Sequence, residues 1–125
     1  MKKMLLIAGL ALSLMSFKYQ SKGDDIINAL KQANVTQFSS FFDNFIDIKI
    51  PEKDEARNVD KTQAGITMRS FFEQNGIKGF DLTSQRAMGG TMYMTGKLEG
   101  EKNYNLTLMM KDKGDKLAII TIRIN

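Results

Sequence analysis

Apolar side chains recur with helical spacing in the first half of the chain. Residues 23–33 (GDDIINALKQA) carry Ile26, Ile27 and Leu30 on one stripe behind two aspartates, a pattern that predicts an amphipathic helix. A second, short helix is predicted over residues 36–44, with Thr36 as its N-cap. Its buried side would hold four phenylalanines: Phe38, Phe41, Phe42 and Phe45.

The middle of the chain predicts one strand and one longer helix. Residues 45–50 alternate isoleucine with polar side chains, which indicates a half-buried strand that Pro51 ends. The following residues 51–58 (PEKDEARN) are expected to form a charged loop. Asp60 and Gln63 have the spacing of a capping box. They predict a helix to about Asn75, with Ala64, Met68, Phe71 and Phe72 on one side.

Period-two alternation dominates the last third of the chain. It predicts strands over residues 79–88, 91–98, 104–111 and 116–125, joined by short connections that contain glycine and favour hairpins. The resulting order is α-α-β-α-β-β-β-β. We therefore expect an α+β fold in which three helices pack on a mostly antiparallel sheet.

Four segments carry a resemblance to a known family. They are GDDIINALKQANVTQFSSFFDNFIDIKI, KTQAGITMRSFFEQN, MYMTGKLEG and NYNLTLMMKDKGDKLAIITIRIN. Over about residues 23–125 the chain resembles a family of short exported proteins from Bacteroidota, the domain of unknown function numbered 4783. The resemblance implies a nuclear-transport-factor-2-like cone, in which a curved sheet wraps around a long helix. It implies no activity.

The N-terminus has the pattern of a secretory signal. Lys2 and Lys3 precede an uncharged apolar run at residues 5–15, which is too short to span a bilayer as an anchor. We expect a cleaved signal over residues 1–20 and a single domain over residues 23–125. The protein would then be exported, to the periplasm or the extracellular medium, without a stable membrane anchor.

The composition of the chain argues against several kinds of partner and catalytic site. Without Lys2 and Lys3, 16 basic and 14 acidic side chains remain, and they form no basic cluster, which argues against nucleic acid as a partner. The chain has no cysteine and no histidine. Disulfides and thiolate catalysis are therefore excluded, and neither a metal site nor a cofactor is expected.

An enzymatic function finds little support in the strand pattern. Enzymes of the fold that the chain resembles use an aspartate base inside the cone, with tyrosine or aspartate as hydrogen-bond donors. Alternation places Asp47 opposite Ile46 and Ile48, and Asp81 opposite Phe80 and Leu82, so both carboxylates should point outward. We assign no catalytic residue, and an enzyme remains the third hypothesis.

Methionine suggests a candidate ligand site. Met68 on the long helix, with Met92, Met94 and Met110 on strands, could line a pliable cavity, and Tyr104 shares the inward face. The leading hypothesis is a non-enzymatic exported module that binds a small apolar ligand in its cone. The alternative for the same residues is gap-filling in a small core.

The outer sheet face suggests a candidate interface. Alternation gives it Tyr93, Thr95, Asn105, Thr107, Met109, Ile119, Thr121 and Arg123, a mixture more apolar than a solvated sheet needs. We single out Tyr93, Thr107, Ile119 and Arg123 as candidate interface residues. Proteins of the fold that the chain resembles often dimerise through this face, so the second hypothesis is an interaction module or homodimer. The alternative is an ordinary, partly solvated sheet surface.

Overall fold

A computed structural model of the protein describes residues 23–125. Two helices, α2 (Asp24–Lys31) and α3 (Val35–Ser39), come first, followed by strands β1 (Phe42–Lys49) and β2 (Ala56–Asp60). The long helix α4 (Lys61–Gln74) precedes four strands. These are β3 (Gly79–Met88), β4 (Thr91–Glu99), β5 (Asn103–Asp112) and β6 (Leu117–Ile124).

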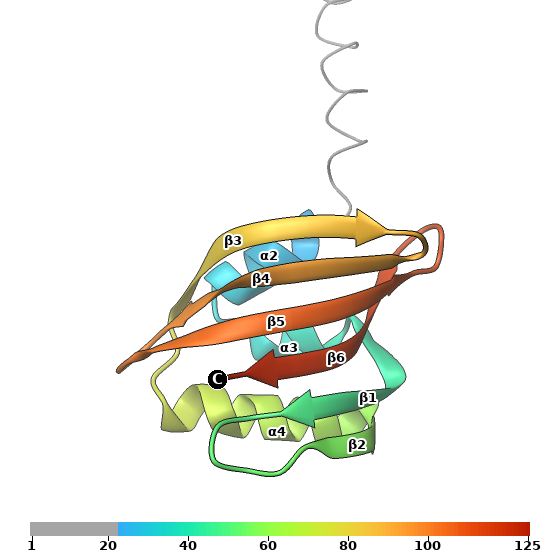
Figure 1. Ribbon diagram of the computed structural model, residues 1–125. Helices are drawn as coiled ribbons and strands as arrows, with labels where there is room; N and C mark the ends of the chain where they lie inside the picture. Colours follow the sequence, from blue (N-terminus) through green and yellow to red (C-terminus); the bar gives the residue numbers. More distant parts are fainter. Residues whose placement is uncertain (1–22) are drawn as a thin grey trace, which may run out of the picture.

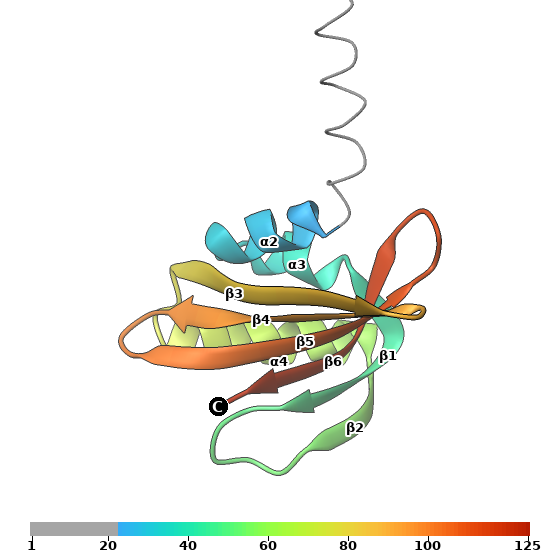
Figure 2. The same ribbon diagram turned by 45° about the horizontal axis from the view of Figure 1, so that its top comes forward.

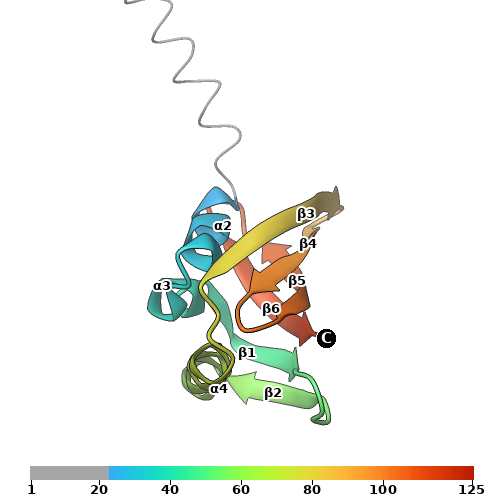
Figure 3. The same cartoon turned by 90° about the vertical axis from the view of Figure 1, so that its left-hand side faces the viewer.

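One curved sheet and one layer of helices make up the domain. The sheet order is β2-β1-β6-β5-β4-β3, and every neighbouring pair is antiparallel except β1 and β6, which are parallel. Figure 1 views the sheet from the side that carries no helix, and Figure 3 shows the three helices of residues 23–125 together on the other side. Helix α2 packs on β3, whereas α4 packs on β1.

The two helices before β1 confirm one expectation and correct another. Helix α2 forms as predicted and buries Ile26, Ile27, Ala29 and Leu30. Helix α3 is shorter than expected, and its N-cap is Asn34, whose side chain accepts a hydrogen bond from the Gln37 backbone N–H at 3.1 Å. The predicted helix over residues 36–44 with a Thr36 cap is therefore wrong.

Strand pairing explains why α3 ends early. Phe42 already lies in β1, opposite Ile119 of the parallel strand β6. Phe38 and Phe42 are both buried, with their rings in a T-shaped contact at 5.1 Å, whereas Phe45 is 61% exposed. The four phenylalanines have helical spacing, but aromatic side chains also suit strands. Pairing with β6 therefore decides that this segment becomes a strand from Phe42 onward.

The expected element order is also corrected. Residues 56–58, predicted as part of a charged loop, form the edge strand β2 together with Val59 and Asp60, so the described order is α-α-β-β-α-β-β-β-β. Two helices precede the first strand, and the third follows β2. An exposed edge strand carries polar and charged residues on both sides, so its sequence does not show the alternation of a half-buried strand.

Helix α4 forms as the sequence predicts. The Asp60 carboxylate accepts a hydrogen bond from the Gln63 backbone N–H at 2.9 Å and caps the helix. Ala64, Met68, Phe71 and Phe72 are its buried residues. Gly76 has a φ of 59° just after the helix, a left-handed conformation that favours glycine. Figure 2 shows α4 running behind the strands.

Gly96 leaves room for the Phe80 ring on the concave side of the sheet. A Cβ atom there would lie 2.4 Å from the Asp81 carbonyl oxygen and 2.4 Å from the Phe80 ring. Phe80 therefore folds over the β4 backbone and reaches the core, in which it is 4% exposed.

Candidate functional site

Three of the four candidate methionines lie in the packed core. Met68 and Met110 are fully buried, and Met94 is 1% exposed. Met92 is partly buried against this core, and its sulfur accepts a hydrogen bond from Gln85 Nε2 at 3.2 Å. The strands thus bring the predicted residues to the face that the sequence assigned to them, where three of them lie among close-packed neighbours.

Tyr104 also faces inward, as expected, and reaches one end of the core. Its ring meets Phe71 in a T-shaped contact at 5.2 Å. Its hydroxyl donates a hydrogen bond to Asn75 Oδ1 at 2.9 Å, and Asn75 Nδ2 donates to the Phe71 carbonyl oxygen at 2.9 Å. The tyrosine is 9% exposed and therefore belongs to the core, with its hydroxyl partnered at the rim.

The two aspartates examined as general bases point away from the core, as strand alternation predicted. Asp47 lies opposite Thr121, and its carboxylate accepts a hydrogen bond from the Asn58 backbone N–H at 3.0 Å. Asp81 is exposed and pairs across the strands with Lys97. Neither aspartate therefore lies beside Tyr104.

The outer sheet face brings several predicted interface residues together. One row across the strands contains Arg86, Tyr93, Met109, Thr121 and Asp47. The next row contains Ser84, Thr95, Thr107, Arg123 and Lys49. We call Tyr93, Thr95, Thr107, Met109 and Thr121, all half-buried, the outer-face patch. Arg123 at its border is exposed, and it pairs with Glu55 at 3.2 Å.

Ile119, a predicted interface residue, is not on this face. The register of β5 with β6 shifts between Met109 and Met110, so that Met109 faces Thr121 whereas Met110 faces Ile119. Ile119 is therefore fully buried and Ile120 is half-buried. A β-bulge reverses the alternation, and parity counted back from Arg123 fails beyond it.

Sequence reasoning misassigned one apolar residue of the outer face. Phe45 alternates with the buried Ile46 and is exposed, although it was expected on the buried side of a helix. Met88 lies on the same face at the opposite edge, beyond Arg86 on β3. Phe45 and Met88 are two of the three large apolar side chains that remain exposed among the described residues; the third is Ile66 of α4.

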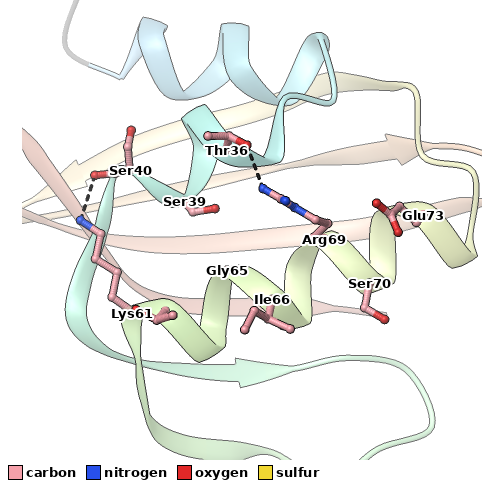
Figure 4. Close-up of a pocket in the computed structure, with 10 residues that line it drawn as sticks. Thr36, Ser39, Ser40, Lys61, Gly65, Ile66, Arg69, Ser70 and Glu73 are labelled. Carbon is pink, nitrogen blue, oxygen red and sulfur yellow. Dashed lines mark hydrogen bonds between the residues drawn. The ribbon is translucent and has the colours of Figure 1, made fainter.

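A groove on the helical layer is the second candidate site. It lies between α3 and α4, has a volume of about 650 Å³, and is floored by Gly65 and Ile66 (Figure 4). The other lining residues carry hydroxyl or charged groups: Thr36, Ser39, Ser40, Lys61, Thr62, Arg69, Ser70 and Glu73. We call it the α3–α4 groove.

Several polar groups of this groove already hold the two helices together. Arg69 Nη2 donates a hydrogen bond to Thr36 Oγ1 at 2.8 Å, and Lys61 Nζ donates to the Ser40 carbonyl oxygen at 3.4 Å. The hydroxyls of Ser39 and Ser40 donate back to carbonyl oxygens of α3. The groove is therefore mainly a contact between α3 and α4 that these hydrogen bonds stabilise.

One carboxyl group of residues 23–125 has a clearly shifted pKa. The hydrogen bond from Lys113 Nζ, at 3.1 Å, and a second bond from the Asn44 backbone N–H lower the pKa of Asp43, at the rim of the sheet. In this part of the chain, no three acidic side chains gather as they would around a metal ion. The same residues include no helix that is long and apolar enough to cross a membrane.

Solved structures show the same fold. A DUF4783 family protein from Bacteroides ovatus superimposes with a TM-score of 0.74 at 24% identity, over 80% of this chain and 90% of that chain. A second, from Bacteroides uniformis, has a TM-score of 0.74 at 23% identity, over 82% of this chain and 94% of that chain. An NTF2-like protein of unknown function from Cytophaga hutchinsonii has a TM-score of 0.56 at 11% identity, over 81% of this chain and 82% of that chain.

These likenesses establish the NTF2-like fold and confirm the resemblance found in the sequence. No curated protein matches the chain, so none supplies an activity. Residues 23–125 match the family described as Domain of unknown function (DUF4783). The chain therefore belongs to the DUF4783 family.

Proposed function

We propose that the protein is an exported, non-enzymatic interaction module that associates with a second copy of itself through the outer sheet face. The observation that carries the proposal is the row Tyr93–Met109–Thr121, which lies on a face that no helix of residues 23–125 covers. Apolar groups gathered on an uncovered face are a common mark of protein contact. Phe45 and Met88 extend the apolar area toward both edges of the sheet.

The size of the face suits a second copy. The sheet has six strands. With about 4.8 Å between neighbouring strands and about 26 Å for eight residues, its face covers about 600 Å². An interface of standard size buries about 800 Å² on each partner. A symmetric pair of outer faces therefore approaches the area that a stable dimer needs.

The charges around the patch also permit self-association. Arg86 and Arg123 lie in the same two rows as Asp47 and Lys49, and Arg123 is already paired with Glu55. Charges of both signs border an uncharged centre, so a second copy brings no large block of like charge.

Sedimentation equilibrium of the mature protein tests this function. We expect a concentration-dependent dimer in the micromolar range, which Met109→Glu weakens at least tenfold by placing a charge in the patch. Ile66→Glu is the matched control, because Ile66 is similarly exposed but lies on the helical layer. A monomer at every concentration, or equal weakening by both variants, would contradict the proposal.

Export is the second part of the proposal and rests on the signal pattern of residues 1–20, which lie outside the described residues. Expression in a bacterial host with cell fractionation tests it. We expect a shortened chain outside the cytoplasm, with its new N-terminus found by mass spectrometry. A full-length chain that stays in the cytoplasm would overturn this part and leave the dimer hypothesis intact.

The hypothesis of an apolar ligand in the cone stays a prediction. Close packing of Met68, Met94 and Met110 favours a filling role for these three side chains, because a ligand would have to displace them. Native mass spectrometry distinguishes the two roles: an added mass that disappears on unfolding would favour a bound ligand.

A further inference from the structure

A polar pocket lies at one end of the domain, apart from the outer-face patch and on the other side of Ile66 and Ser70, two residues that it shares with the α3–α4 groove. It has a volume of about 630 Å³ and is more enclosed than the groove. Helix α4, the loop between β1 and β2 and the turn between β4 and β5 come together at this end (Figure 1). Its lining consists of Ile50, Pro51, Glu52, Lys53, Gln63, Ile66, Thr67, Ser70, Phe71, Gln74, Asn75, Lys102 and Tyr104.

The base of this pocket is aromatic and rigid. Phe71 and Tyr104 are both buried, and the hydrogen bonds of Asn75 fix the tyrosine hydroxyl and the end of α4 together. Lys102 Nζ lies 5.4 Å from the centre of the Tyr104 ring. The aromatic base is therefore preformed, so a ligand that packs against it loses little free energy in ordering these side chains.

The walls carry polar groups that have no hydrogen-bond partner within residues 23–125. Among the described residues, the side chains of Lys53, Gln63, Ser70 and Gln74 make no hydrogen bond, although all four line the pocket. The α3–α4 groove is different, because Lys61 and Arg69 there are bonded to α3. The polar pocket therefore offers amide, hydroxyl and ammonium groups that remain available to a ligand.

We propose that this pocket binds a small polyhydroxylated acid of the sugar-acid class. Carboxamides such as those of Gln63 and Gln74 both donate and accept hydrogen bonds, which matches the hydroxyl groups of a polyol. The ammonium groups of Lys53 and Lys102 would hold the acidic group, and the aromatic base would support the carbon skeleton. The volume lies in the range of small-molecule pockets, 300–1,000 Å³ or so. The proposal is independent of dimer formation.

The turn that forms one wall has a strained residue. The Lys53 N–H donates to the Ile50 carbonyl oxygen at 3.3 Å, so residues 50–53 form a β-turn, in which Glu52 has a φ of 66°. Glycine or asparagine usually occupies such a position. The Glu52 and Lys53 side chains of this turn line the pocket, and Lys102 joins them from the turn between β4 and β5. The lining therefore carries one carboxylate and two ammonium groups.

A titration followed by ¹H–¹⁵N correlation spectra of the mature protein tests the inference. The probe is sodium galacturonate, with galactose as the neutral control and sodium acetate as the acid that lacks hydroxyls. We expect saturable shifts of the backbone amides of residues 71–75 and 102–104, with a dissociation constant of about 1 mM, and at least tenfold weaker binding of both controls.

Two variants locate the binding. Lys102→Gln should weaken galacturonate binding about tenfold, whereas Lys61→Gln, which removes an ammonium group from the α3–α4 groove, should leave it unchanged. Absence of saturable shifts would overturn the proposal. So would equal shifts with acetate, which would indicate binding of any anion, or equal weakening by the two variants.

Discussion

The two faces of the sheet differ most clearly at Met109 and Met110. These residues are neighbours in β5, yet Met110 is fully buried in the core, whereas Met109 lies half-buried on the outer face between Tyr93 and Thr121. The same side chain therefore fills space on one face and offers a contact surface on the other. Residue type alone thus does not separate packing from recognition; the direction of the side chain and the element that covers it do.

The largest effect is expected from a charge placed at Ile119, with the neighbouring Ile120 as the comparison. Ile119→Lys should unfold the domain, because it places an ammonium group in the core. The free-energy cost of burying this charge is as large as the whole free energy of unfolding of a small protein. Ile120→Lys should leave the domain folded, because Ile120 is half-exposed. Circular dichroism and thermal unfolding check both variants. Two folded proteins of equal stability would contradict the observed register.

The next effect compares the two methionines of β5. Met110→Ala should lower the free energy of unfolding by about 2–5 kcal/mol, the range for a buried large side chain that leaves a cavity. Met109→Ala should change it by about 0.5 kcal/mol or less in dilute, monomeric protein. Urea unfolding measures both. Similar losses at the two positions would mean that the outer face is also part of the core.

A moderate effect is expected at Gly96 on the concave face. Gly96→Ala should lower the free energy of unfolding by about 1–3 kcal/mol, because the new methyl group collides with the Phe80 ring and the Asp81 carbonyl oxygen. Thr95→Ala, one residue away on the outer face, is the control and should cost less. The comparison fails if Gly96→Ala is the more stable of the two proteins.

The smallest effect is expected at a polar contact on the rim of the sheet. The pKa of Asp43 is lowered chiefly by the hydrogen bond from Lys113, so the carboxylate stabilises the folded protein at neutral pH. This contribution is lost as the pH falls through the lowered pKa, below the ordinary value of about 4. Asp43→Asn should therefore be slightly less stable than the natural protein at pH 7, and the difference should shrink as the pH falls below about 4. Urea unfolding at pH 7 and at several acidic pH values measures the difference, and a gap that widens in acid would contradict the assignment.

Local signals were sufficient for helices α2 and α4 and for the hairpins. The Asp60–Gln63 cap, the stop at Gly76 and the glycine-containing turns each act over a few residues, so the sequence predicts α4 and strands β3–β6 closely. The same holds for the inward direction of Met68 and Tyr104. Strand β2 was missed because its residues are exposed and gain their pairing only from β1.

The side-chain directions of the candidate residues were predicted well where strand alternation is unbroken and poorly where it is not. Tyr93 and Thr107 lie on the expected face, since β4 pairs regularly with β5 along its whole length. Ile119 does not, because the bulge depends on the pairing of β6 with β5. The polar pocket was not foreseen either, since it joins residues from a loop, a helix and a turn that are distant in the sequence.

The sequence by itself determined the family, the fold class and the period of most elements, because capping, turn chemistry and hydrophobic spacing are local. Only the tertiary structure decided where α3 ends, which isoleucine of β6 enters the core, and which polar side chains remain free around Tyr104. These features depend on contacts between distant segments, and pairing with a neighbouring strand or helix outweighs local preference wherever the two compete.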